Sequence, residues 1–154
     1  MINVHGTCIA FGRFGVLIRG SSGMGKSSLA LQLLDSEGFG TGSTKLKARL
    51  VADDQVMLER KGLKISASSP VNLAGKIEIR GLGIVSIANL KAAQLRLIVD
   101  LVPPQSIPRL PDLSETHAEL LALSLPRLYL DAHGTDAAAK LRAAVVHLKS
   151  NKSF

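Results

Sequence analysis

The segment from Gly20 to Ser27, GSSGMGKS, limits the possible folds of this chain more than any other stretch. It fits the pattern G-x-x-x-x-G-K-[ST], in which backbone N–H groups surround phosphate oxygens. Such a loop follows a buried strand and opens a helix, because the positive end of the helix helps to hold the anion. The apolar run GVLIR (15–19) ends just before the loop, and apolar residues at helical spacing follow it. We therefore predict a strand, a phosphate-binding loop and a helix from Lys26 to Gly38, and regard an incidental Gly/Ser-rich turn as the weaker alternative.

Each part of this loop suits one part of a bound phosphate chain. The glycines let the backbone fold around the oxygens, Lys26 can reach the outer phosphates, and the Ser27 hydroxyl can bind Mg²⁺. We expect the whole loop to contact the ligand: Gly20, Ser21, Ser22, Gly23, Met24, Gly25, Lys26 and Ser27. The pattern is specific for phosphate binding but does not identify the reaction.

The rest of the chain has many short apolar runs and few helical patterns. We expect one strand in INVHGTCIAF (2–11), a strand pair or a bent strand in ARLVADDQVMLER (48–60), and a hairpin arm in KGLKISAS (61–68). Apolar residues alternate around a Gly-x-Gly break in VNLAGKIEIRGLGIVSI (71–87), and further strands are expected in AQLRLIVDLV (93–102) and LPRLYLDA (125–132). The segments GFGTGSTKLK (38–47) and PPQSIPRLPD (103–112) predict loops, the second because of its four prolines.

A second helix is predicted near the C-terminus. Thr135 can cap a helix from Asp136 to about Lys149, whose apolar stripe consists of Ala138, Leu141, Val145 and Leu148. The predicted fold is therefore α/β, with a β-rich sheet, one helix after the glycine-rich loop and one C-terminal helix, and not a regular βαβ repeat.

The length of 154 residues fits one domain, which we assign to residues 1–150, with a frayed tail at 151–154. No apolar run reaches the roughly 18 residues of a membrane span. The N-terminus shows no signal peptide. Cys8 is the only cysteine, so the chain forms no disulfide within itself, and we interpret Cys8 as a buried bystander rather than a reactive thiol. These features favour a cytoplasmic location.

The net charge is +7, from 19 Lys and Arg against 12 Asp and Glu. A basic chain favours an acidic partner such as nucleic acid. The basic residues are dispersed, however, and aromatic residues make up only 3%, which leaves little for bases to stack on. An anionic nucleotide together with an acidic protein partner explains the charge equally well.

Two segments supply candidate acids. Asp53 and Asp54 follow an apolar strand, and since neighbours on a strand point to opposite faces, we expect only one of them to face the site. That acid can hold Mg²⁺ or accept a proton, unless both acids lie in a solvated turn. Glu78 and Arg80 alternate with isoleucines, so both charged side chains share one face, either at a phosphate site or on a solvated sheet face.

Several segments follow one another along the chain in the order VHG, GVLIRGSSGMGKS, LVADD, EIRGLGIVSI, and IVDL followed by PRLPD. Together they resemble the C-terminal catalytic domain of the bacterial HPr kinase/phosphorylase family. The resemblance extends from Val4 to Asp112, and EIRGLGI is its most specific part. It implies an ATP- and Mg²⁺-dependent kinase for a serine of the phosphocarrier protein HPr, which many members also dephosphorylate by phosphorolysis. It further implies a P-loop fold similar to phosphoenolpyruvate carboxykinase, a homo-oligomer (commonly a hexamer), and here a short form lacking the N-terminal domain.

The resemblance also implies roles for single residues. Lys26 matches the catalytic lysine, Asp54 the proton-shuttling acid, and Ser27 and Glu78 the magnesium ligands, with Asp53 beside them as a further metal-side acid. Three more positions match catalytic residues: His5, Arg80 and Arg109. Without the resemblance, His5 would be interpreted as an ordinary strand histidine and Arg109 as an isolated loop arginine.

The chain departs from the family pattern at several places. Ser28 stands where an acid often follows the loop serine, the segment after EIRGLGI is short, and LSLPRLYLDAHGTD (123–136) replaces the Pro/Gly-Arg-Asn loop linked to phosphorolysis. Alternatives to the kinase are a small-molecule phosphotransferase on the same scaffold, a nucleotide-sensing module and a nucleic-acid-binding NTPase. The first two remain open, and the low aromatic content disfavours the third.

Overall fold

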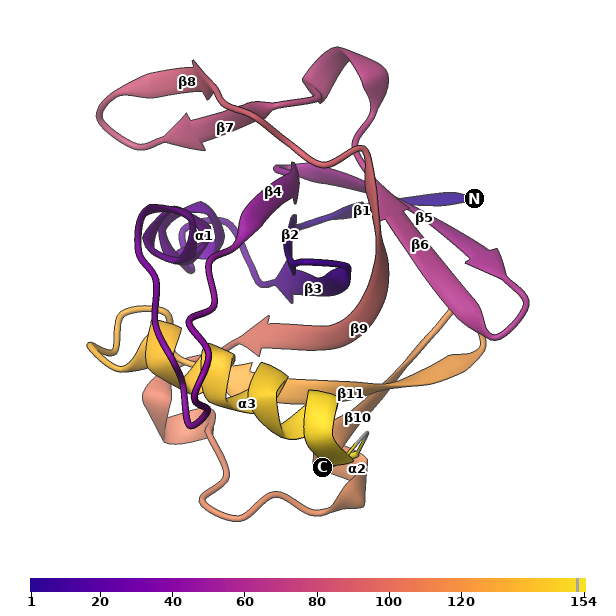
Figure 1. The fold of residues 1–154 in the computed structure, drawn as a ribbon, viewed down its shortest axis with the longest axis vertical. Helices are drawn as coiled ribbons and strands as arrows, with labels where there is room; N and C mark the ends of the chain where they lie inside the picture. Colours follow the sequence, from indigo (N-terminus) through magenta and orange to yellow (C-terminus); the bar gives the residue numbers. More distant parts are fainter. Residues whose placement is uncertain (152) are drawn as a thin grey trace.

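The structure is a computed structural model that describes residues 1–151 and 153–154. A nine-stranded sheet forms the body of the described chain, and a separate two-stranded hairpin lies beside it (Figure 1). The sheet runs in the order β1-β5-β6-β9-β3-β2-β4, with β11 also paired to β9 and β10 to β11. This confirms the predicted α/β fold with a large sheet and a C-terminal helix.

The elements alternate irregularly along the chain. The sheet strands are β1 (Ile2–His5), β2 (Thr7–Phe11), β3 (Phe14–Arg19), β4 (Arg49–Ala52), β5 (Gln55–Lys61), β6 (Lys64–Ser68), β9 (Ala92–Leu101), β10 (His117–Leu120) and β11 (Leu123–Leu130). The separate hairpin consists of β7 (Lys76–Ile79) and β8 (Gly83–Ser86). The helices are α1 (Lys26–Asp35), α2 (Leu113–Thr116) and α3 (Ala137–Asn151), with short 3₁₀ turns η1 (Val71–Leu73) and η2 (Pro104–Ser106).

Strand β9 organises the sheet because it pairs with three other strands. It is parallel to β3 and β11 and antiparallel to β6. Parallel strands end at the same edge of a sheet, so the segments after β3, β9 and β11 leave from one edge. A bidentate ion pair joins two of these ends, with Arg19 Nε and Nη2 at 2.7 and 2.8 Å from the Asp100 carboxylate. The glycine-rich loop therefore starts at a strand end that this ion pair holds in place against β9.

Two apolar clusters lie on either side of the sheet. One packs α1 and α3 against β2, β3, β9 and β11, with Leu29, Leu97 and Leu141 fully buried. The other lies inside the curl of the sheet, where β5 and β6 fold over β2, β3 and β4, and it includes Leu17 and Leu58. Burial from both sides explains why β3 is a continuous apolar run, as is the part of β9 at residues 97–99, whereas the first half of β9 alternates.

Both predicted helices are present, with shifted ends. Helix α1 stops at Asp35, before the predicted Gly38, because Ser36 is already extended. Helix α3 begins one residue later than predicted and continues to Asn151, with Leu141, Val145 and Leu148 buried as expected. No helix in the described ranges is long and apolar enough to cross a membrane.

Several of the predicted strand boundaries are wrong. The first predicted strand is two strands, because β1 pairs with β5 whereas β2 pairs with β3 and β4. The short elements α2 and β10 lie between predicted segments and were not expected. In the predicted tail, Asn151 ends α3 and the Phe154 ring stacks on His147, while residue 152 lies outside the described residues.

Cys8 provides a test of this packing. It is fully buried on β2, and burial raises the pKa of its thiol to about 12. The thiolate is the reactive form, so we expect native protein at pH 8 to react with a disulfide reagent at least about 100-fold more slowly than protein unfolded in guanidinium. Equal rates would contradict the burial of Cys8 and its interpretation as a bystander.

Candidate active site

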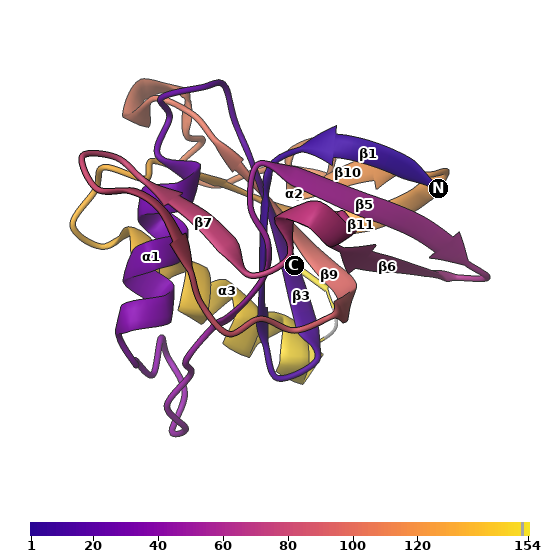
Figure 2. The ribbon, with the colours of Figure 1, turned by 90° about the horizontal axis from the view of Figure 1, so that it is seen from above.

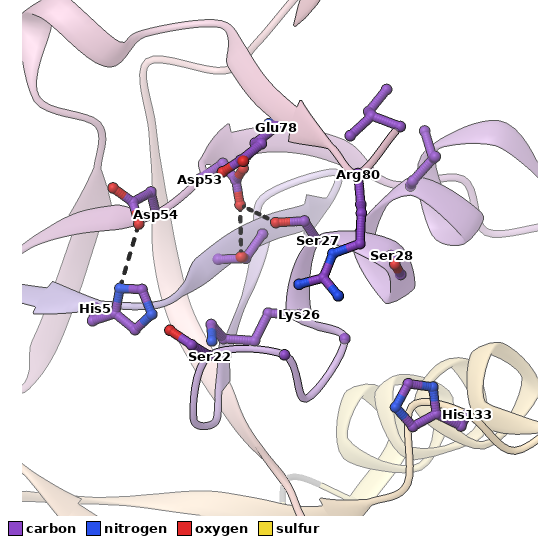
Figure 3. A pocket seen from close by; sticks show the side chains of 15 residues that line it. His5, Ser22, Lys26, Ser27, Ser28, Asp53, Asp54, Glu78, Arg80 and His133 are labelled. Carbon is purple, nitrogen blue, oxygen red and sulfur yellow. Dashed lines mark hydrogen bonds and ion pairs between the residues drawn. The ribbon is translucent and has the colours of Figure 1, made fainter. Parts of the chain in front are cut away.

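A cleft of about 580 Å³ opens beside the glycine-rich loop, within the roughly 300–1,000 Å³ typical of ligand sites (Figure 3). Its walls come from β1 and β2, the loop and α1, the turn between β4 and β5, the hairpin, and the segment after β11. The lining residues are His5, Thr7, Ser22, Gly23, Gly25, Lys26, Ser27, Ser28, Leu31, Asp53, Asp54, Glu78, Ile79, Arg80 and His133.

The glycine-rich loop connects β3 to α1, as its pattern predicts. Gly25 precedes the first helical residue with φ 94°, a conformation that suits glycine. A methyl group there would also lie 3.1 Å from the Ala132 Cβ. Five of the eight predicted loop residues line the cleft, whereas Gly20, Ser21 and Met24 do not.

Lys26 is buried in the loop, and its ammonium is held by the loop itself. Its Nζ donates to the carbonyls of Gly20 at 2.8 Å and Ser21 at 3.2 Å. Among the described residues, no carboxylate lies within ion-pair distance of this ammonium. A buried cation with only neutral partners favours an incoming anion, and a phosphate chain meets that need.

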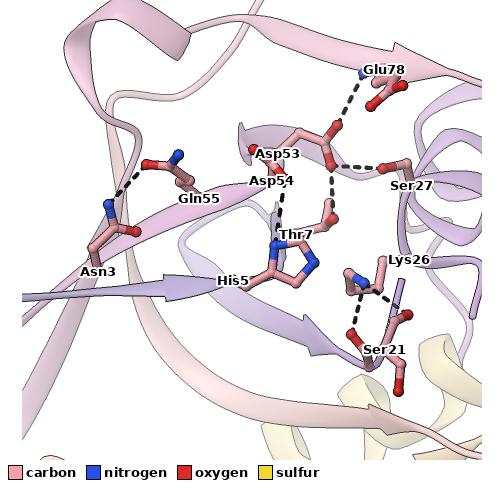
Figure 4. A network of polar contacts seen from close by, with 11 residues as sticks. Asn3, His5, Thr7, Ser21, Lys26, Ser27, Asp53, Asp54, Gln55 and Glu78 are labelled. Atoms are coloured by element: carbon pink, nitrogen blue, oxygen red, sulfur yellow. Dashed lines mark hydrogen bonds and ion pairs between the residues drawn. The ribbon is translucent and has the colours of Figure 1, made fainter. Parts of the chain in front are cut away.

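Asp53 is the polar centre of the site. Its side chain is 5% exposed, and Oδ1 accepts hydrogen bonds from the hydroxyls of Thr7 and Ser27, each at 2.8 Å (Figure 4). Its Oδ2 accepts from the backbone N–H of Glu78 at 3.0 Å. One carboxylate thus ties together β2, the start of α1 and the hairpin.

The oxygens of Ser27, Asp53 and Glu78 are the ligand type that Mg²⁺ prefers. The described residues contain no group of three or more His, Cys, Asp or Glu side chains able to hold a metal alone. A site of two carboxylates and a hydroxyl suits a Mg²⁺ ion that also binds phosphate and water.

Asp54 faces the same cleft, which corrects the expectation that only one of the two acids would. Strand β4 ends at Ala52 and β5 starts at Gln55, so the two acids form a turn and strand alternation does not apply. Asp54 has φ 67°, and its side chain is 62% exposed. Its Oδ1 lies 3.4 Å from Nδ1 of His5, an ion pair when the imidazole is protonated.

The hairpin brings Glu78 and Arg80 to the opposite wall. Both charged residues line the cleft as expected, but Ile79 between them lines it too, and only Ile77 is fully buried on the other face. In Figure 3 the Arg80 guanidinium points toward Lys26. The cleft is therefore lined by two cations, three carboxylates and two imidazoles, those of His5 and His133.

The model of the family described as HPr Serine kinase C-terminal domain matches residues 1–153. The chain belongs to this family. The HPr kinase/phosphorylase of Listeria welshimeri is 40% identical over 94 residues, covering 60% of this chain and 27% of that protein. The Bordetella pertussis HPr kinase/phosphorylase is 36% identical over 154 residues, covering 92% of this chain and 46% of that protein.

A solved structure supports the same family. The HPr(Ser) kinase/phosphatase of Coxiella burnetii superposes with a TM-score of 0.76 at 25% identity, covering 99% of this chain and 92% of that one. The chain spans less than half the length of the curated relatives named above.

Thr7 and His133 also line this cleft, but the sequence did not predict them as site residues. Thr7 is fully buried and gives its hydroxyl to Asp53, a contact between β2 and the β4–β5 turn. His133 lies beside Gly25, because the segment after β11 leaves from the same edge as the glycine-rich loop. Neither residue has a local sequence signal, since each reaches the cleft only through the sheet order.

Arg109 is not brought to this cleft within one copy of the chain. It lines a second cleft of about 760 Å³ between the proline-rich segment, β11 and the end of α3. This second cleft is also lined by Tyr129, His147 and Phe154. Its catalytic role, implied by the family resemblance, stays a prediction that this cleft does not support.

Proposed function

We propose that this chain is the catalytic domain of an ATP-dependent kinase that phosphorylates a serine of an HPr-like phosphocarrier protein in a phosphotransferase system. The main support is that one cleft combines a buried, anion-seeking Lys26 with an exposed carboxylate, Asp54, on the facing wall. Phosphoryl transfer requires charge stabilisation on one side and an acceptor-orienting group on the other. Family membership identifies the acceptor class.

In this mechanism Asp54 accepts the proton of the serine hydroxyl as its oxygen attacks the γ-phosphorus. The exposure of Asp54 suits this role, because a hydroxyl on a folded protein must reach the base from solvent. His5 holds the carboxylate from the β1 side. Lys26 and Arg80 offset the charge on the transferred phosphoryl group.

Ser27, Asp53 and Glu78 would hold the magnesium ion. Bound there, Mg²⁺ would neutralise negative charge on the phosphates. Asp53 already accepts the Ser27 hydroxyl and the Glu78 N–H, so the donors are positioned relative to one another by this chain's own hydrogen bonds.

The reverse reaction belongs to the same proposal. Inorganic phosphate attacks the phosphoserine phosphorus, the bond to the serine oxygen breaks, and pyrophosphate forms. Protonated Asp54 then gives its proton to the departing serine oxygen. A homo-oligomer and a cytoplasmic location, both inferred from the sequence, are part of this proposal as well.

The first test is transfer of label from γ-labelled ATP, with Mg²⁺, to the HPr-type carrier of the same organism. We expect label on a carrier serine, and a loss of at least about 100-fold in rate for Lys26→Met, which removes charge stabilisation but keeps the side-chain length. Tight ATP binding without labelled carrier would instead favour a nucleotide-sensing module or a small-molecule acceptor. Equal labelling by Lys26→Met would contradict the proposed role of the loop.

A further inference from the structure

The β7–β8 hairpin exposes two large apolar side chains beside the cleft. Leu82, in the turn, is 71% exposed and Ile84, on β8, is 73% exposed. Figures 1 and 2 show the hairpin alongside α1, separate from the main sheet. Exposed apolar side chains that gather next to a site indicate a contact surface more often than scattered ones do.

Strand register places Ile84 on the same face of the hairpin as Glu78. Ile84 is directly opposite Glu78, and opposed residues of an antiparallel pair share a face. Glu78 lines the cleft from the exposed face of the hairpin, whereas Ile77 is buried on the opposite face and Ile79, on that opposite face, also lines the cleft. Ile84 does not itself line the cleft, but it is the exposed neighbour of the proposed magnesium ligand Glu78.

The same face carries cations on either side of this apolar contact. Lys76 precedes Glu78 by two residues, so it shares this face, and it is exposed. Arg80, in the turn after β7, lines the cleft at the other end of the hairpin. We define the Ile84 face as Lys76, Glu78, Arg80 and Ile84, with Leu82 at its tip.

The Ile84 face is fixed relative to the reacting groups. The Glu78 N–H donates to Asp53, and the Ile87 N–H donates to the Gly75 carbonyl at 2.7 Å, which closes the base of the hairpin. The buried Ile77 anchors the hairpin from its other side. A partner that touched Ile84 would thus be held at a constant distance from Asp54 and Lys26.

We infer that the Ile84 face is the docking surface for the phosphoryl acceptor, a folded protein whose acceptor serine is flanked by apolar side chains with carboxylates at their border. This inference rests on the proposed function. A small-molecule acceptor would bind within the cleft and gain nothing from side chains this exposed. A protein surface buries Ile84 and Leu82 on contact, and its carboxylates pair with Lys76.

The test compares Ile84→Ser and Leu82→Ser with wild type in steady-state transfer to the HPr-type carrier. Burial of one such side chain predicts a rise in KM for the carrier of at least about fivefold in Ile84→Ser, with kcat and the Kd for ATP unchanged. Leu63→Ser is the matched control, because Leu63 is 86% exposed in the turn between β5 and β6 and does not line the cleft. Its KM should equal that of wild type.

Direct binding separates this inference from the proposed function. The Kd is measured for a carrier whose acceptor serine is replaced by alanine, so that catalysis is not required. Weaker binding by Ile84→Ser supports the docking surface even if wild type transfers no label, a result that would overturn only the kinase proposal. Unchanged KM and Kd in both variants would overturn the docking surface alone, and absence of any carrier binding by wild type would overturn both.

Discussion

Replacing Asp54 with asparagine should slow phosphoryl transfer by about 100- to 10,000-fold, the range that a general base contributes. Asparagine has the same shape but cannot take the serine proton. Asp54 is exposed, and its only side-chain partner among the described residues is His5, so the substitution leaves no buried group unpaired. The free energy of unfolding and the Kd for ATP should therefore stay close to those of wild type.

This expectation is checked by single-turnover transfer to the carrier together with nucleotide titration and denaturant unfolding. Asp136→Asn is the control, since Asp136 is also an exposed aspartate but pairs with Lys140 on α3, outside the cleft. It should transfer at the wild-type rate. Asp54→Asn activity within about fivefold of wild type would exclude Asp54 as the base, because a base contributes at least about 100-fold.

The parts of the site that the sequence predicts correctly are those with local causes. The glycine-rich loop needs glycines, a strand before it and a helix after it, and all three requirements are met within residues 15–35. Glu78 and Arg80 share the cleft as predicted, although Arg80 lies in the turn after β7 and Ile79 between them lines the cleft as well. The buried stripe of α3 follows from helical spacing in the same way.

The errors arise where the backbone leaves a regular conformation. Alternation predicts opposite faces for Asp53 and Asp54, but it holds only within a strand, and Asp54 adopts φ 67° in a turn between two strands. Aspartate tolerates this conformation better than most residues, yet nothing adjacent to Asp54 requires it. The turn lies where the chain changes its pairing partner, because β4 pairs with β2 whereas β5 pairs with β1.

Other contacts depend on the order of strands, which no local pattern gives. His133 reaches Gly25 because β11 lies parallel to β9, which is parallel to β3. Arg109 follows β9 from the same edge, but its segment runs along β11 and α3 to the second cleft. Sequence distance and residue type alone do not distinguish these two outcomes.

Asp53→Ala, unlike Asp54→Asn, should cause a large loss of stability. Asp53 is buried and accepts three hydrogen bonds, so its removal leaves the Thr7 hydroxyl unpaired in the interior and frees the hairpin from the sheet. Unpaired buried donors cost about 1–3 kcal/mol each, and we expect a loss of about 2–3 kcal/mol in the free energy of unfolding. Denaturant titration measures this directly.

Asp53→Asn distinguishes the hydrogen-bond network from simple loss of side-chain volume. The amide oxygen can still accept from Thr7 and Ser27, but the NH₂ group would then face the Glu78 N–H, so two donors would meet. We expect a smaller loss of stability than in Asp53→Ala, accompanied by weaker carrier phosphorylation because the hairpin no longer has a fixed attachment. If Asp53→Ala unfolded at the same denaturant concentration as Asp54→Ala, Asp53 would not be the residue that holds the cleft together.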